Sequence, residues 1–189
     1  LGRDTEAGGR ASGIWLDEAD RLARSGTLAA TARGPISTGS MKMAGVLDKV
    51  VSVKPGESYL CLVSGPLRVC HVTDHMPLSQ VCTLLSAELI EKSLTTLDER
   101  LRSWGLRKPR IGVAGLNPHA MGPEESKAIA PGVKAAAARG IVVEGPISPD
   151  SIFRHCIEGK YDAVLAMYHD QGHIASKTWG FSGNSAVII

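Results

Sequence analysis

The sequence has neither a long apolar run nor a strong excess of charge. No apolar stretch in the 189 residues approaches the roughly 20 residues that a membrane-spanning helix needs. The first ten residues, Leu1 to Arg10, lack the apolar centre of a secretion signal. The net charge of +2 gives no basis for binding nucleic acid or an anionic membrane. We therefore expect a globular protein with neither partner, and the start at Leu1 rather than Met favours a processed or incomplete chain.

The motifs of common nucleotide and redox sites are also missing. The sequence holds no GxGxxG, Walker A or GxSxG motif, so a Rossmann-type dinucleotide site has no support. Its four cysteines form no CxxC pair, and Cys61 and Cys70 lie in apolar runs, where a free cysteine behaves as a small buried hydrophobe. These features predict four reduced thiols in a cytoplasmic protein.

What the sequence does contain is an alternation of strand-like and helix-like segments. Two short apolar runs meet at Gly65-Pro66 and predict a pair of strands joined by a turn. The apolar spacing from Ser79 to Trp104 predicts one long helix, with Ser79 as N-cap and Gly105 as its stop. Pro131 is expected to kink or restart a later helix. We expect helices also over 14–30, 123–139 and 150–157, and strands over 58–64, 67–73, 110–114, 141–143 and 163–167. This alternation predicts an α/β fold with a largely parallel sheet.

Three histidines share a position just beyond the carboxyl end of an expected strand. They are His75, His119 and His169. Ligands bind at this edge of open α/β sheets, and neutral imidazole is a good ligand for divalent transition metals. The spacings match no short metal motif, so loop histidines that only bond to backbone remain the alternative.

The other three histidines give weaker signals. His71 lies within an expected strand, and His155 lies on an expected helix beside Arg154, where we expect it to be solvated. His173 follows His169 by four residues and would share a helical face with it. Because Gly172 makes a turn equally compatible with this segment, His173 is not included in the expected metal site.

Several strings resemble signature segments of the 4-hydroxythreonine-4-phosphate dehydrogenase family. The two specific ones are GLNPHA and DAVLAMYHDQG, at residues 115–120 and 162–172. Three supporting ones are PISTGSMKMAG, VCHVTDHMPL and EGPISPDSIF, at residues 35–45, 69–78 and 144–153. The resemblance covers nearly the whole chain in the family's order.

The resemblance implies a fold, a site and a reaction. The implied fold has two α/β/α lobes around a central cleft, similar to isocitrate and isopropylmalate dehydrogenases, and residues 1–189 would cover parts of both lobes. The implied metal ligands are His75, His119 and His169, in a homodimer whose site borrows a histidine from the partner subunit. Asp170 and Lys177 match positions that face the substrate. The implied cofactors are NAD or NADP and a divalent metal such as Zn, Mg or Co.

The implied activity is oxidative decarboxylation of a hydroxy acid in pyridoxine biosynthesis. The expected substrate is 4-phosphooxy-L-threonine or a close analogue such as 4-phospho-threonate. Ser185-Ala186 departs from the family's usual Val-Asn and resembles dehydrogenases of aromatic cis-dihydrodiol carboxylates, which is the alternative activity. The chain also lacks the family's glycine-rich loop after Ala120 and its expected segments at both ends. A non-catalytic, metal-binding remnant of the family is therefore a third possibility.

Overall fold

The computed structural model describes residues 2–50, 53–180 and 183–189, in two compact units. The first unit, Leu1–Ser52, contains helix α1 (Glu6–Arg24), helix α2 (Thr38–Met43) and the 3-10 turn η1 (Leu47–Lys49). Residues 2–50 contain no strand. The expected second α/β lobe, with a cleft between the lobes, therefore remains a prediction for the whole protein.

Helix α1 begins and ends earlier than the expected helix over 14–30. The side chain of Thr5 caps it by accepting a hydrogen bond from the backbone N–H of Gly8. The helix ends at Arg24, before a turn at Gly26 with a φ of +74°. Gly9 and Gly13 are its buried residues, and a Cβ on Gly9 would collide with the backbone of Ser40. The packed face of α1 is thus set by small residues and not by its large apolar ones.

The second unit, Val53–Ile189, is built on a six-stranded sheet with the order β4-β3-β5-β2-β1-β6. Strands β4, β3, β5 and β2 are parallel neighbours, whereas β1 is antiparallel to both β2 and β6. The strand bounds are β1 Leu60–Ser64, β2 Leu67–His71, β3 Arg110–Ala114, β4 Val142–Ile147, β5 Ala163–Ala166 and β6 Ser185–Ile188. The expected α/β fold with a largely parallel sheet and the hairpin at Gly65-Pro66 are both confirmed.

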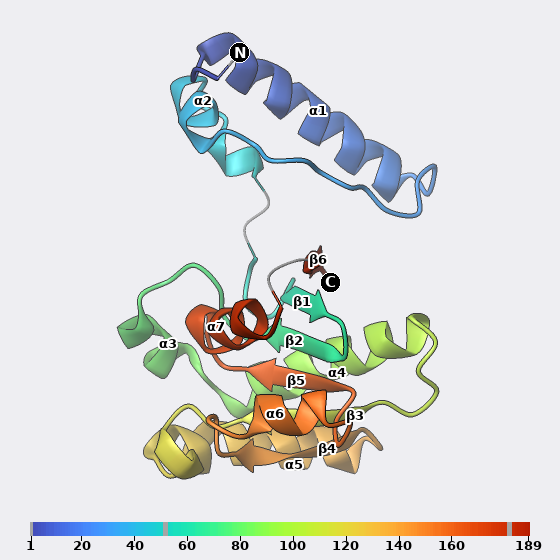
Figure 1. Ribbon diagram of the computed structural model, residues 1–189, viewed down its shortest axis with the longest axis vertical. Coiled ribbons are helices and arrows are strands. Elements are labelled where there is room, and N and C mark those ends of the chain that lie inside the picture. Colours follow the sequence, from blue (N-terminus) through green and yellow to red (C-terminus); the bar gives the residue numbers. More distant parts are fainter. Residues whose placement is uncertain (1, 51–52, 181–182) are drawn as a thin grey trace. The chain divides into compact units, whose positions relative to one another are not determined.

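Helices cover both faces of this sheet, as Figure 1 shows. Along β5, Ala163 and Leu165 join the core beneath α4 and α5, while Val164 and Ala166 join the core beneath α6. Helix α7 also packs on β1, β2 and β5. The bounds of these helices are α4 Ala87–Ser103, α5 Ala130–Ala138, α6 Ile152–Ile157 and α7 His169–Trp179. A strand buried on both faces explains why β5 is apolar at every position.

The expected single helix from Ser79 to Trp104 is wrong. Two helices occupy this stretch, α3 (Leu78–Leu84) and α4, and Ser79 lies inside α3 instead of capping it. The chain is extended at Ser86, whose side chain accepts a hydrogen bond from the backbone N–H of Leu89. Serine is favoured at helix N-caps but also occurs within helices, so apolar spacing alone did not reveal the break. The stop at Gly105 is confirmed by its φ of +99°.

The helical segment before β4 contains an irregularity next to Pro131, as expected. A π-helical turn, η3 (Glu125–Ile129), leads directly into α5. Proline lacks the N–H of a regular helical turn, and its ring displaces the preceding carbonyl, so a local widening is its usual consequence. This turn brings Glu125 into a buried position.

Across the described parts of the chain, no helix combines the length and apolarity needed to cross a membrane.

Candidate functional site

The three expected metal ligands all follow strands that point toward one edge of the sheet. His75 lies in the segment after β2, His119 lies in the 3-10 turn η2 (Pro118–Ala120) after β3, and His169 begins α7 after β5. These strands are parallel, and β5 lies between the other two. Their carboxyl ends therefore meet, which is the usual place for a ligand site in such a sheet.

The structure brings His75 and His169 together beside Asp74. The centroids of the two imidazole rings lie 4.8 Å apart. Each of the three side chains offers one ligand atom, and these atoms lie within 4.8 Å of one another. Asp74 is buried, His169 is half-buried and His75 is exposed. Imidazole nitrogens and carboxylate oxygens are ligands that divalent transition metals use in proteins.

His119 is not part of this group in the residues that the structure describes. Its backbone has a φ of +55°, as does that of Ala120. Two successive non-glycine residues with positive φ are uncommon and cost conformational energy. They stand where the resemblance led us to expect a glycine-rich loop. The structure thus places His119 at the expected strand end without bringing it to His75 and His169.

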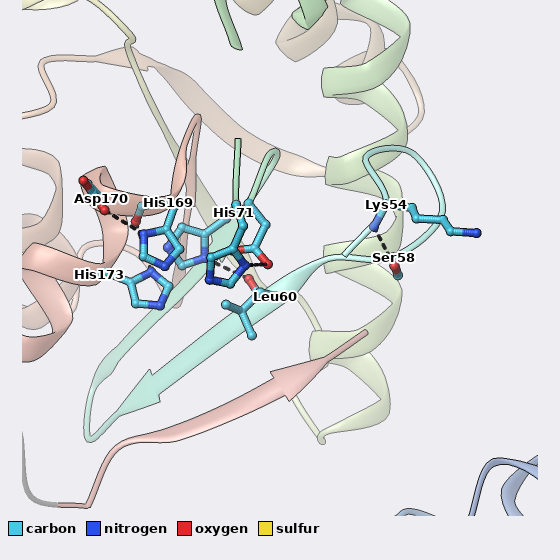
Figure 2. Close-up of polar contacts among 9 residues, drawn as sticks. Lys54, Ser58, Leu60, His71, His169, Asp170 and His173 are labelled. Atoms are coloured by element: carbon cyan, nitrogen blue, oxygen red, sulfur yellow. Dashed lines mark hydrogen bonds and ion pairs between the residues drawn. The ribbon is translucent and has the colours of Figure 1, made fainter. Parts of the chain in front are cut away.

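Four imidazoles form a continuous row from the sheet to the surface. Figure 2 shows His71, His173 and His169 packed against one another. The ring centroids of His71 and His173 are 4.9 Å apart, and those of His173 and His169 are 3.6 Å apart in a stacked arrangement. His75 completes the row. The sequence interpretation left out His71 and His173, although their contacts make them the support on which His169 rests.

The innermost ring, His71, is held in its neutral form. It is fully buried, and burial lowers its pKa to about 4. Its Nδ1 lies 2.9 Å from the carbonyl oxygen of Leu60, so the neutral ring donates from Nδ1 (Figure 2). The interpretation of His71 as a strand residue is confirmed, because it is the last residue of β2.

The segment after His169 is helical, so the turn considered at Gly172 is wrong. Gly172 is a buried residue within α7, and a Cβ there would collide with Nε2 of His71. The glycine therefore permits close packing against the buried ring and does not mark a turn. His173 then lies one turn after His169, with its Nδ1 3.0 Å from the carbonyl oxygen of His169. A helical interpretation of the sequence would have paired the two.

Asp170 and Lys177 line one depression together with His169. This cavity of about 410 Å³ lies along α7 and is also lined by His173, Ile174 and Thr178. Oδ1 of Asp170 lies 2.7 Å from Nδ1 of His169, and this hydrogen bond lowers the pKa of the Asp170 carboxyl (Figure 2). A carboxylate that accepts from one imidazole nitrogen orients the ring and leaves the other nitrogen free for a ligand.

Two further residues hold the strand-end segments, and the sequence interpretation had not identified them. The side chain of Gln171 accepts from the backbone N–H of Met167 at 2.6 Å and donates to the carbonyl oxygen of Gly115 at 2.7 Å. It thereby joins the segment of His169 to the segment of His119. Glu125 is buried and accepts from the backbone N–H groups of Leu116 and Asn117, each at 2.7 Å. Only the position of Gln171 inside the YHDQG string pointed to either residue.

His155 lies outside the site, as expected, but it is not fully solvated. It is half-buried on α6, and its ring centroid lies 6.4 Å from that of Tyr161. All four cysteines are free thiols, of which Cys61, Cys70 and Cys156 are buried. Burial raises the pKa of Cys61 to about 12, so this thiol stays protonated.

Sequence comparison assigns the chain to a known family. The family described as pyridoxal phosphate biosynthetic protein PdxA matches residues 1–189, which is the entire chain. The chain belongs to the PdxA family. The resemblance read from the GLNPHA and DAVLAMYHDQG strings is thereby confirmed.

Individual PdxA-family relatives carry related names. A protein of Novosphingobium aromaticivorans, provisionally named 4-hydroxythreonine-4-phosphate dehydrogenase, is 65% identical over the full chain, which covers 57% of that protein. A D-threonate 4-phosphate dehydrogenase of Pectobacterium atrosepticum is 37% identical over 88% of the chain and 54% of its own length. The chain thus spans a little over half the length of these relatives.

Solved structures of similar proteins share the fold. A 4-hydroxythreonine-4-phosphate dehydrogenase from Klebsiella pneumoniae superposes with a TM-score of 0.84 at 37% identity, over 98% of this chain and 61% of that one. A terephthalate 1,2-cis-dihydrodiol dehydrogenase from Burkholderia xenovorans LB400 superposes with a TM-score of 0.76 at 27% identity. The match covers all of this chain and 63% of the Burkholderia chain. The fold is therefore common to both substrate classes that the sequence suggested.

Proposed function

We propose that this chain forms the metal-binding part of an NAD- or NADP-linked dehydrogenase that oxidatively decarboxylates a hydroxy acid. The observation that carries the proposal is the convergence of His75 and His169, with ring centroids 4.8 Å apart, at the carboxyl ends of parallel strands. Membership of the PdxA family along the whole chain supports it. The dehydrogenase names of its relatives support it further.

The residues present fit a divalent metal such as Zn, Mg or Co. His75 and His169 provide imidazole nitrogens at the carboxyl ends of β2 and β5, and their ligand atoms lie within 4.8 Å of each other. We propose that His119 of the partner subunit completes the set in a cytoplasmic homodimer. This fits its position at the strand ends but outside the cluster within one chain. No nucleic acid or membrane partner is proposed.

Each remaining site residue has a physical task in this reaction. When bound, the metal supplies a Lewis acid for the substrate hydroxyl, and NAD or NADP supplies the hydride acceptor. Asp170 accepts a hydrogen bond from His169 and so holds that ring in one orientation. The ammonium group of Lys177 lines the same cavity and offsets negative charge on an acidic substrate.

The preferred substrate class is a phosphorylated hydroxy acid. The relatives at 65% and 37% identity are named for 4-hydroxythreonine 4-phosphate and D-threonate 4-phosphate. A cis-dihydrodiol carboxylate is the second candidate, supported by the structural similarity at 27% identity. Ser185 and Ala186, which suggested it, lie on β6 beside Val63 and Leu62.

Metal content and substrate oxidation test the proposal together. We expect about one divalent metal per chain in the purified protein, and its loss in His169→Ala. A matched control, His155→Asn on α6, should retain the metal because it lies outside the site. Reduction of NAD or NADP is then followed with 4-phosphooxy-L-threonine, D-threonate 4-phosphate and an aromatic cis-diol carboxylate.

Three outcomes would count against this proposal or a part of it. Metal content that is unchanged by His169→Ala would show that the histidine site does not hold the metal. Oxidation of the aromatic diol alone would replace the phosphorylated substrate with the second candidate. A protein that binds metal through His169 but oxidises none of the three would favour the non-catalytic remnant.

A further inference from the structure

Asp74 is a buried carboxylate whose surroundings do not satisfy it. It has 6% of its surface exposed, directly after the strand β2. Its Oδ1 is buried and has no hydrogen-bond partner within the described residues. A buried carboxylate is strongly disfavoured unless it is paired with a cation or with hydrogen-bond donors. The unpaired Oδ1 is therefore available to a cation or to a hydrogen-bond donor.

The side chains around Asp74 do not pair with its Oδ1. The ion-pair contact of Asp74 in the described part of the chain is with His75, at 3.0 Å from Oδ2 to Nδ1. This contact uses the other carboxylate oxygen and leaves Oδ1 without a partner. No lysine or arginine of residues 2–50, 53–180 or 183–189 forms an ion pair with Asp74. The nearest group of metal-ligating atoms is the one formed with His75 and His169.

We propose that Asp74 is itself a metal ligand, so that one chain supplies a carboxylate together with His75 and His169. This inference rests on the proposed function and adds a ligand of a different chemical type to it. Two ligands that are each about 2.1 Å from a metal lie at most about 4.2 Å apart. The present limit of 4.8 Å is close to that value. The side chain of His75 is 78% exposed and is free to rotate the small distance required.

A carboxylate among the ligands changes which metals the site prefers. Together with His119 of the partner subunit, the ligands would be three imidazoles and one carboxylate, a mixed nitrogen and oxygen set that suits Zn, Fe or Mn and leaves room for substrate when the coordination number expands. The negative charge of Asp74 also lowers the net charge of the complex. Metal binding would at the same time give Oδ1 the positive partner that it lacks in the chain alone.

Asp74 could instead act only on His75, by accepting its Nδ1 proton and orienting the ring. The two roles predict different sizes of effect. Removal of an orienting partner costs about 10- to 100-fold in metal affinity and leaves the ligand set unchanged. Removal of a direct ligand costs more than about 100-fold and changes the coordination itself.

Cobalt(II) titration of the full chain separates these roles, because the visible absorption of cobalt depends on its ligands. The variants are Asp74→Asn and, as a matched control, Asp98→Asn. Asp98 is also buried, but it pairs with Arg102 on α4 at 2.6 Å. We expect Asp74→Asn to weaken cobalt binding more than about 100-fold and to alter the spectrum of the residual complex. The control should match the wild type in both affinity and spectrum.

Other results would overturn the inference in distinguishable ways. An unchanged cobalt spectrum in Asp74→Asn, with a smaller loss of affinity, would remove Asp74 from the ligands and leave the proposed function intact. A folded wild-type chain that binds no cobalt would overturn both. If Asp74→Asn fails to fold, the infrared difference spectrum of the wild type with and without zinc decides the question. A shifted carboxylate stretching band supports the inference, and the absence of such a shift overturns it.

Discussion

Buried polar side chains control the geometry of the site one residue at a time. Glu125 ties down the backbone after β3 by accepting hydrogen bonds from Leu116 and Asn117. Gln171 connects that segment to the start of α7. Each of these side chains satisfies backbone groups that would otherwise be unpaired at a crowded strand end. Loss of either side chain would therefore disturb the backbone segments that position His119 and His169.

The charge of Glu125 should make folding stability depend on pH. Burial alone would raise the pKa of this carboxyl, but the hydrogen bonds from Asn117 and Leu116 outweigh burial and lower it below the ordinary value of 4.5. A carboxyl with a lowered pKa stabilises the fold above its unfolded pKa. That contribution is lost as the pH falls through the folded pKa. Urea unfolding of Glu125→Gln should thus show a loss of about 1–3 kcal/mol near neutral pH.

The difference between Glu125→Gln and the wild type should shrink as the pH falls below 4.5. Glu99→Gln, on an exposed position of α4, is the control and should leave stability almost unchanged at every pH. A difference between Glu125→Gln and wild type that stays constant from neutral to acidic pH would mean that the charge of Glu125 contributes nothing.

At the scale of the element, α7 is the helix that organises the site. It begins at His169 and places His173 and Lys177 on successive turns, at a spacing of four residues. It also packs Gly172 against the buried ring of His71. The sequence allowed a turn at Gly172 because glycine disfavours helix interiors. The contact with β2 overrides that local preference.

Substitution of Gly172 by alanine tests this packing, because the sign of the change in folding stability depends on whether the new Cβ meets the His71 ring. In an exposed helix the change would stabilise the protein by about 1 kcal/mol. Here we expect Gly172→Ala to destabilise it by about 1–3 kcal/mol, because the new Cβ displaces the His71 ring. Chemical denaturation measures the difference. Thr178→Ala, at an exposed position of the same helix, is the control and should be neutral or slightly stabilising. A more stable Gly172→Ala protein would show that α7 does not press on His71.

At the scale of the whole molecule, the order of the strands decides which histidines meet. Strand β5 lies directly beside β2, and the segments that follow them bring His169 to His75. His119 follows β3, on the other side of β5, and remains outside the cluster. Apolar side chains that a monomer would expose lie nearby, with Met121 next to the turn of His119 and Ile174 and Trp179 on α7. Exposed apolar groups of this kind often mark contacts between subunits.

We therefore expect a dimer in solution in which His119 reaches the partner's metal site. Light scattering coupled to gel filtration should give twice the chain mass of 19.9 kDa. His119→Ala and His169→Ala should each lack metal when prepared alone. After they are unfolded and refolded together, part of the metal content should return, because a mixed dimer contains one intact site. A monomer with full metal content would contradict the shared site.

The sequence by itself determined the α/β class, the order of strands β1 to β5 along the chain and the family, but it did not predict β6. Periodic apolar runs gave the hairpin at Gly65-Pro66 and the strand that precedes His169, because strand spacing is local information. Local spacing did not reveal the break at Ser86, because the apolar spacing continues across it and serine, although favoured at caps, also occurs within helices. Local spacing also did not reveal that α1 begins at Glu6.

Only the tertiary structure decided which side chains meet. The grouping of Asp74, His75 and His169 depends on the pairing of β2 with β5, which joins residues about a hundred positions apart. The row from His71 to His173 and the bridge of Gln171 also join distant segments. The hydrogen bonds of Glu125 join residues only eight and nine positions apart, but they depend on the π-helical turn that directs its side chain to the end of β3. Such contacts depend on packing between elements, and a single sequence carries no local signal for them.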